Sequence, residues 1–167
     1  MNVLVVVGSA PCTKEDLEKF HALYKGECDY MAIGKDADIA FKDCKYFATY
    51  HIEDVRTSYG FGPYPFLLIH HERQVGVDIV ESYNPPLSIS GSSAILGVKA
   101  ALTLGYTKIV LCGVPLQGKQ KTIRNLHYDR FIVGWKVLLV EIEGIVKSMS
   151  GSTKDLLGMP TRKWLNE

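Results

Sequence analysis

The chain has 167 residues, of which 47% are hydrophobic and 22% charged, a composition that indicates a globular protein and excludes an intrinsically disordered one. The formal net charge of +1 gives no general attraction to nucleic acid or to an anionic membrane, so we expect neither as a partner. No stretch suggests a membrane span, and the four cysteines form no CxxC pair, as is typical of a reduced intracellular protein. We expect one cytoplasmic domain, residues 1–167, whose oligomeric state the sequence leaves open.

The chain opens on a predicted strand, turn and helix. Residues 2–7 are rich in valine without polar alternation, which indicates a strand covered on both faces. The turn that follows consists of Gly8, Ser9 and Ala10. A helix is expected over residues 13–24, with Thr13 and Asp16 resembling a capping box. This order of elements is a nucleotide-binding layout, although the G-x-G-x-x-G pattern of dinucleotide sites is absent.

Further strands are predicted over residues 29–33, 46–50, 66–69 and 77–80, the last of them short and at a sheet edge. Small or polar residues follow three of these strands, namely Gly34, His51, His70 and His71. Imidazoles can bind metals, but neighbouring histidines in a strand point to opposite faces, so we expect no metal site there. The sequence YGFGPY is expected to form a mobile aromatic loop near these strand ends.

The middle of the chain is interpreted as the unit around which the sheet is organised. Apolar residues at helical spacing predict a helix that Ser90 or Ser92 caps and Gly105 ends. The continuous apolar run KIVLC, residues 108–112, predicts a second buried strand that ends at Gly113. A helix N-terminus presents free N–H groups and a partial positive charge, so the SGSS sequence before this helix is a candidate phosphate site.

The last third of the chain is predicted to contain a helix over residues 128–140, a strand over residues 145–147 and a short helix that ends at Gly158. Trp135 is expected in the core, and Trp164 is expected to dock the C-terminal tail. Strands that alternate with helices predict an α/β fold with a mostly parallel sheet, with strands 2–7 and 108–112 in its interior.

The residues that follow the strands predict where a ligand binds. In a parallel sheet the carboxyl ends of the strands share one edge, and open α/β sheets bind ligands at that edge. Glycines, serines and histidines line it in this sequence, from Gly8 after the first strand to Ser148 and Ser150 after the last. The sequence therefore predicts a small-molecule site at this edge.

Successive blocks of the sequence resemble a known superfamily. The blocks are VLVVVGSAPCTKEDLEKF, DYMAIG, SGSSAILGVKAALTLGYTKIVLCGVPL and IVKSMSGSTKDLLG. Their order resembles that of a Rossmann-like superfamily that includes bacterial single-domain sialyltransferases and archaeal-type 6-hydroxymethylpterin diphosphokinases. The sequence looks most similar to small phage- and prophage-borne members of this superfamily. The resemblance implies a three-layer Rossmann-like α/β domain that binds a nucleotide.

The resemblance to the sialyltransferases also implies roles for individual residues. Two turns hold the nucleotide of a CMP-sugar in that family, and by position they correspond to Gly8, Ser9, Ala10, Ser90, Gly91 and Ser92. Gly34 stands where the family has an asparagine that contacts the nucleotide, and Gly113 ends a neighbouring strand of the same site. His127 is implied as the catalytic base, in a lid that is shorter here than in the family.

Three functions are consistent with these observations. The first is a transferase that acts on a nucleotide or nucleotide-sugar, resembling a minimal glycosyltransferase, in which His127 deprotonates an acceptor hydroxyl. The second is a non-catalytic nucleotide-binding module encoded by a phage or prophage. The third is a diphosphokinase-like transfer from ATP, which is the one case that predicts Mg²⁺. The ligand is a nucleotide in each case, and no other cofactor is predicted.

Overall fold

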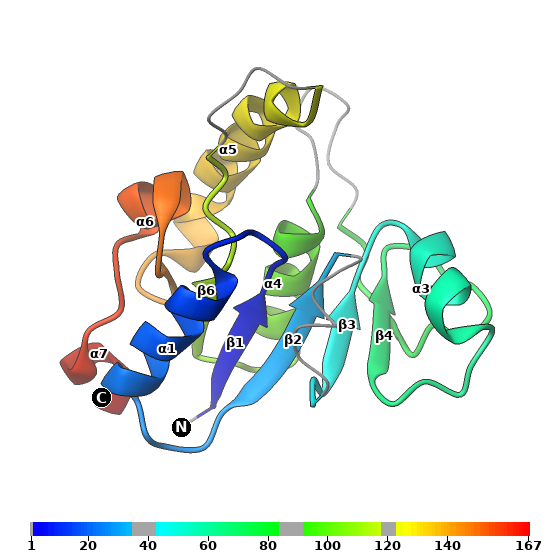
Figure 1. Ribbon diagram of the computed structural model, residues 1–167, viewed down its shortest axis with the longest axis horizontal. Coiled ribbons are helices and arrows are strands. Elements are labelled where there is room, and N and C mark those ends of the chain that lie inside the picture. The colour runs from blue at the N-terminus through cyan, green and yellow to red at the C-terminus, as the bar shows by residue number, and fades with distance from the viewer. Residues whose placement is uncertain (1, 35–42, 84–91, 118–122) are drawn as a thin grey trace.

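The computed structural model of the protein describes residues 2–34, 43–83, 92–117 and 123–167, with residues 123–129 described by their backbone alone (Figure 1). Its strands are β1 (Val3–Val7), β2 (Asp29–Ile33), β3 (Tyr46–Ala48), β4 (Leu67–His70), β5 (Ile79–Val80), β6 (Lys108–Cys112) and β7 (Val146–Ser148). Its helices are α1 (Thr13–Leu23), α3 (Ile52–Tyr59), α4 (Ser93–Thr103), α5 (Ile123–Ile142), α6 (Gly151–Leu157) and α7 (Arg162–Asn166).

The strands form one parallel sheet that is the middle layer of three (Figure 1). Leu4 and Val6 of β1 pack with residues of α4 and α5, whereas Val3, Val5 and Val7 pack toward α1 and α7. Both faces of β1 are therefore covered, which is why this strand is apolar without alternation. The predicted three-layer Rossmann-like α/β fold is confirmed, and β1 and β6 lie inside the sheet as predicted.

The strand order β5-β4-β3-β2-β1-β6-β7 reverses direction beside β1. From β1 the chain proceeds outward through β2, β3 and β4 to β5, then returns to place β6 and β7 on the other side. The register pairs Val3 with Lys108 and Val7 with Cys112, so β1 and β6 end level with each other. Open α/β sheets bind ligands at such a reversal, outside the carboxyl ends of the strands.

The helix α4 begins and ends as predicted. Ser92 Oγ accepts a hydrogen bond from the Ile95 N–H at 3.3 Å, which satisfies one of the donors that the first turn leaves unpaired. Gly105, just after the helix, has φ 83°, the left-handed conformation that glycine adopts without strain. The cap fixes the position of the first turn of α4 relative to the sheet.

Replacing Ser92 with alanine is expected to lower the free energy of unfolding by about 1 kcal/mol, because the Ile95 N–H loses its acceptor. Urea denaturation monitored by circular dichroism measures the change. Ser58→Ala is the control, since Ser58 lies exposed on α3 and donates only to the Asp54 carbonyl at 3.2 Å. A loss for Ser92→Ala no larger than that for Ser58→Ala would contradict the capping role.

Several element boundaries differ from the sequence-based prediction. Helix α3 was not predicted, because only Ile52 and Val55 of its eight residues are buried, too few to produce a helical period. The strand predicted over residues 46–50 ends at Ala48, since His51 is already the N-cap of α3. Helix α7 was also missed, and α5 is longer at both ends than the predicted helix over residues 128–140.

The capping box predicted at Thr13 and Asp16 is wrong. Cys12 occupies the N-cap position of α1 and makes no side-chain cap hydrogen bond. Thr13 Oγ1 donates instead to the carbonyl oxygens of Gly8 and Ala10, and Asp16 Oδ2 accepts from the Gly113 N–H. Both side chains therefore stabilise turns at the edge of the sheet.

The two tryptophans lie as predicted. Trp135 is fully buried in the core, and the Trp164 Nε1–H donates to the Gly144 carbonyl oxygen at 2.8 Å. The neighbouring Leu165 is also fully buried, packed with residues of β1 and α1. These contacts dock the C-terminal helix on the sheet layer. Among the described residues, no helix has the length and apolar character needed to cross a membrane.

Candidate functional site

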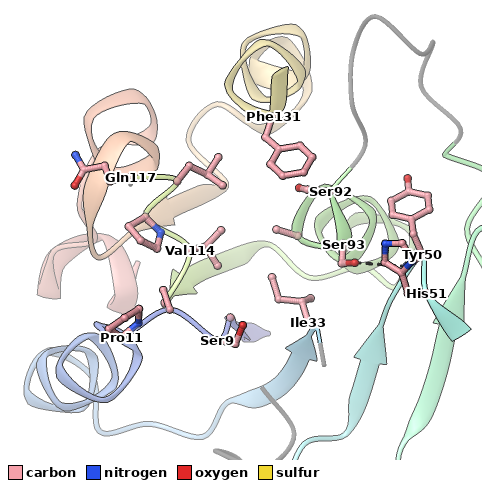
Figure 2. A pocket seen from close by; sticks show the side chains of 17 residues that line it. Ser9, Pro11, Ile33, Tyr50, His51, Ser92, Ser93, Val114, Gln117 and Phe131 are labelled. Carbon is pink, nitrogen blue, oxygen red and sulfur yellow. Dashed lines mark hydrogen bonds between the residues drawn. The ribbon is translucent and has the colours of Figure 1, made fainter. Parts of the chain in front are cut away.

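A cleft of about 440 Å³ opens where the strand order reverses, at the carboxyl ends of β1, β2 and β6. Its volume lies in the range of small-molecule sites. The lining residues are Gly8, Ser9, Ala10 and Pro11 after β1; Ile33 and Gly34 at the end of β2; Tyr50 and His51 before α3; Ser92, Ser93 and Ala94 at the start of α4; Gly113, Val114, Pro115, Leu116 and Gln117 after β6; and Phe131 of α5 (Figure 2).

The turns after β1 and β6 line the cleft together and touch each other. The Gly8 N–H donates to the Cys112 carbonyl oxygen at 2.8 Å, and a Cβ added to Gly8 would lie 2.2 Å from the Gly113 carbonyl oxygen. Thr13 Oγ1 donates to the Gly8 carbonyl oxygen at 2.9 Å. No side chain fits at position 8, so the close approach of the two turns requires glycine there.

A buried carboxylate joins three segments beneath the cleft. Asp16 of α1 is only 1% exposed, and its Oδ2 accepts from the Gly113 N–H at 2.8 Å and from Ser150 Oγ at 2.6 Å. The turn after β6 and the start of α6 are thereby tied to α1. From the sequence, Asp16 was assigned to a helix cap, because Gly113 and Ser150 are 97 and 134 positions away and leave no local signal.

Replacing Asp16 with alanine is expected to lower the free energy of unfolding by about 3 kcal/mol, because it leaves the buried Gly113 N–H without an acceptor. Chemical denaturation measures this change. Asp16→Asn retains one acceptor oxygen and should cost less than Asp16→Ala, whereas Glu18→Ala, on the exposed face of the same helix, should change stability by less than about 0.5 kcal/mol. Equal losses for Asp16→Ala and Glu18→Ala would contradict this role.

The segment after Gly113 is held from the other side by α6. Thr153 Oγ1 donates to the Val114 carbonyl oxygen at 2.6 Å, and the Ser152 N–H donates to the Pro115 carbonyl oxygen at 2.8 Å. Leu116 has φ 47°, a left-handed conformation that a leucine rarely adopts. Such outliers persist where surrounding contacts fix the backbone, and they are frequent at functional sites.

Two helices begin near the cleft, and their first turns differ in charge. The first turn of α1 contains the acidic residues Glu15 and Asp16, whereas that of α4 contains no acidic residue. Ser93 and Ala94, at the start of α4, line the cleft and carry N–H groups that have no partner within the helix. The partial positive charge of α4 is therefore not offset by its own side chains, which makes it the better anion site of the two.

The wall nearest α3 contains Tyr50 and His51. The Tyr50 hydroxyl donates to the Tyr83 carbonyl oxygen at 2.8 Å, and the Tyr50 N–H donates to Ser93 Oγ at 3.4 Å (Figure 2). Burial raises the pKa of the Tyr50 phenol, so it stays protonated at neutral pH. His51 is exposed, and its Nδ1 lies 3.1 Å from Glu53 Oε1. Phe131 and Ser9 lie at opposite sides of the cleft in Figure 2.

Most residues predicted for the site lie together at this cleft. Gly8, Ser9, Ala10, Gly34, Ser92 and Gly113 all line it. Ser90 and Gly91 lie outside the described residues. The backbone of His127 lies in α5 about one turn before Phe131, and its side chain is outside the described part. Of the lining side chains that the structure describes, none is a carboxylate, a lysine or an arginine.

Other predicted features lie away from the cleft. His70 is buried with its Nδ1 accepting from the Glu72 N–H at 3.0 Å, and neither His70 nor His71 lines the cleft. The predicted aromatic loop over residues 59–64 begins in α3 and packs Tyr59 and Tyr64 against Phe66, which precedes β4. Within the described residues, no group of three or more His, Cys, Asp or Glu side chains could hold a metal ion.

Several lining residues were missed from the sequence, among them Ile33, Tyr50, Val114, Gln117 and Phe131. Ile33 and Val114 carry the apolar character expected of core residues, and Tyr50 was placed inside a strand. Phe131 lies in the first turn of the helix predicted over residues 128–140, where nothing in the sequence tells a cleft-facing aromatic from a core one. Their role depends on how segments far apart in the chain come together.

The sequence matches no family profile and no curated protein. The fold is nevertheless similar to solved structures of the sialyltransferase CstII. The Campylobacter jejuni enzyme in complex with the substrate analogue CMP-3FNeuAc aligns with 100% of this chain and 88% of its own, at TM-score 0.58 and 14% identity. Its complex with cytidine-5'-monophosphate aligns with 97% of this chain and 87% of its own, at TM-score 0.57 and 13% identity. A point mutant of this α-2,3/8-sialyltransferase aligns with 100% and 89%, at TM-score 0.55 and 16% identity. This chain therefore has a Rossmann-like α/β fold similar to that of the sialyltransferase CstII.

Proposed function

We propose that this chain binds a nucleotide-sugar in the cleft at the carboxyl ends of β1, β2 and β6. The observation that carries the proposal is that the Gly8 and Gly113 turns meet the N-terminus of α4, whose first turn has no acidic side chain, at the point where the strand order reverses. The structural similarity to CstII, which has been solved with CMP and with a CMP-sugar analogue, supports the choice of ligand class.

The phosphate of the ligand would lie at the start of α4. Ser93 and Ala94 offer backbone N–H groups there, and the Ser92 hydroxyl caps the same turn. The described lining contains no lysine or arginine, and among these residues it is the backbone dipoles at the start of α4 that would attract the phosphate. A Cβ added to Gly34 would have no atom closer than Ser9 Oγ at 4.0 Å, so Gly34 leaves room for a close approach of the nucleoside, and Ile33, Val114 and Phe131 give it apolar surface.

We further propose that the chain transfers the sugar to an acceptor hydroxyl, with His127 as the base. The acceptor oxygen would bond to the anomeric carbon of the sugar, the bond from that carbon to the phosphate oxygen would break, and the nucleotide would leave. His127 would take the proton of the acceptor, since an imidazole has a pKa suited to this task near neutral pH. Its position in α5, one turn from the cleft residue Phe131, supports this role.

Thermal-shift screening against nucleotides and nucleotide-sugars, with and without Mg²⁺, tests the proposed binding. A ligand at 100 times its Kd should stabilise the protein by about 2.7 kcal/mol. For a chain of this size we expect a rise in Tm of about 5 to 10 °C. A larger shift with a CMP-sugar than with ATP supports the proposal. A shift that requires both ATP and Mg²⁺ supports diphosphokinase-like chemistry instead.

Transfer of a radiolabelled sugar from the nucleotide that the screen identifies tests the proposed reaction. Release of the nucleotide together with labelled product supports a transferase. Tight binding with no turnover, over a panel of acceptors that carry free hydroxyls, supports the non-catalytic binding module.

A further inference from the structure

The helix α5 is apolar on two opposite faces. Trp135, Leu138 and Ile142 are buried in the core, as expected for the inner face of a helix that covers a sheet. Val133, Val137 and Val140 are 44%, 59% and 91% exposed. Their spacing of four and three residues puts them on one side of the helix, away from the core-facing residues. We call these three valines the α5 stripe.

The exposed valines of the α5 stripe do not stabilise the isolated chain. Valine is a poorer helix former than alanine or the long polar residues, so an exposed helix face gains nothing from three valines. A helix that is apolar all round is normally covered on all sides. The surface beside the stripe is also hollowed, because Ile132 and Val133 of α5 and Leu156 of α6 line an open groove of about 590 Å³.

The charges beside the α5 stripe are mixed in sign. Lys136 and Asp155 line the groove next to it, and Glu143 is the first residue after α5. The Glu143 N–H still donates to the Leu139 carbonyl oxygen at 2.9 Å, as in a further helical turn, which puts Glu143 on the same flank as Lys136, seven residues earlier. Arg130 lies exposed on the other side, and Glu141 is already paired with Lys99 at 2.6 Å. An anionic membrane or a nucleic acid would favour a surface of lysines and arginines alone.

We propose that the α5 stripe is the contact surface between two copies of this chain, which pair through antiparallel α5 helices about a two-fold axis. A two-fold interface requires a patch that is complementary to itself. An apolar stripe with both charge signs on one flank meets this requirement, because an antiparallel pair brings that flank of one helix against the same flank of the other.

The register of the pair follows from the most exposed valines. When Val137 of one copy packs against Val140 of the second, Lys136 lies opposite position 141 of that second copy. Glu143 of the second copy, which follows the end of its α5, is then two residues further along the chain, an axial offset of about 3 Å. The long side chains of Lys136 and Glu143 can bridge this distance, and the two-fold axis repeats the ion pair.

The proposed contact also involves the cleft indirectly. Phe131, two residues before the first valine of the stripe, lines the cleft from the same helix. A second copy would thus hold in place the helix that bears one wall of the cleft. The dimer itself is inferred from the surface of α5 and does not depend on which ligand the cleft binds.

Sedimentation velocity of the full chain at about 1 to 200 μM tests the proposal. The wild type should show a dimer that dissociates on dilution. Val137→Glu should weaken association by at least about 100-fold, because the two-fold axis places two buried glutamates in each interface. Val75→Glu is the matched control, since Val75 is 71% exposed on a turn far from α5 in the chain, and it should leave association unchanged.

Exchanging the charges at positions 136 and 143 tests whether the α5 stripe binds a second copy of the chain rather than another partner. Lys136→Glu and Glu143→Lys should each weaken association about tenfold, and the double variant should restore it, because the ion pair re-forms with its signs reversed. Circular dichroism verifies that each variant is folded. A wild type that stays monomeric at every concentration overturns the proposal. A dimer that is equally sensitive to Val75→Glu and Val137→Glu also overturns it, as does binding of the stripe to anionic vesicles without dimer formation.

Discussion

Gly8→Ala should lower the free energy of unfolding by about 3 kcal/mol, one of the largest effects expected of any single methyl group in this chain. The added Cβ would lie 2.2 Å from the Gly113 carbonyl oxygen and 3.0 Å from Val114 Cγ2. Neither the backbone of the facing turn nor the strand that bears it can move without breaking the bond from the Gly8 N–H to the Cys112 carbonyl. Chemical denaturation of wild type and variant measures the loss.

Gly105→Ala provides the control for this prediction. Gly105 has φ 83°, and a Cβ added there would meet no atom within 4 Å, so the substitution costs only the strain of a left-handed alanine, about 1 kcal/mol. The difference between the unfolding free energies of the two variants isolates the contribution of the contact between the turns after β1 and β6. Similar losses for Gly8→Ala and Gly105→Ala would show that the two turns do not approach each other as described.

His127→Asn should reduce the rate of sugar transfer by about 10²–10⁴-fold, the usual contribution of a general base, while the affinity for the nucleotide-sugar changes little. Asparagine keeps much of the polar shape of histidine but cannot accept a proton near pH 7. The measurement is kcat and KM for wild type and variant on the nucleotide-sugar that the thermal screen identifies.

Substituting two further histidines shows whether the loss of rate is specific to His127. His21→Asn, on the exposed side of α1 with its Nε2 3.4 Å from the Tyr30 hydroxyl, should leave the rate unchanged. His51 lines the cleft from the wall nearest α3, so His51→Asn tests it as the rival base. Equal rates for wild type and His127→Asn would remove His127 from the mechanism, and a loss confined to His51→Asn would assign the base to His51.

The fold was predictable because its central strands are apolar on both faces. The strands predicted over residues 29–33 and 108–112 have the bounds of β2 and β6, and the second of them is a continuous apolar run. The edge of the fold was less predictable. Helix α3 buries only Ile52 and Val55 and was missed, and the edge strand predicted over residues 77–80 is present at the edge but shorter, as β5 (Ile79–Val80). Short elements at the periphery depend on contacts with distant segments more than on their own sequence.

The cleft was predictable in outline and not in detail. Glycine after a strand identified the turns at Gly8 and Gly113, and the rule that open α/β sheets bind ligands at the carboxyl ends of their strands placed the site there. Asp16 was misassigned, since its partners Gly113 and Ser150 are far along the chain. The aromatic residues of the cleft were also missed, because Tyr50 and Phe131 follow the same periodicity as core residues.

Isothermal titration with a CMP-sugar, on wild type and on two tryptophan variants, tests the proposed ligand site most directly. Ser9 is exposed in the cleft, so Ser9→Trp should fill the space of the ligand without disturbing the core. Ser58→Trp places the same side chain on the exposed face of α3, outside the cleft. We expect saturable binding by wild type and Ser58→Trp, and a loss of at least about 100-fold in affinity for Ser9→Trp. Equal affinities for all three proteins, or no binding of any nucleotide-sugar by wild type, would contradict the proposed site.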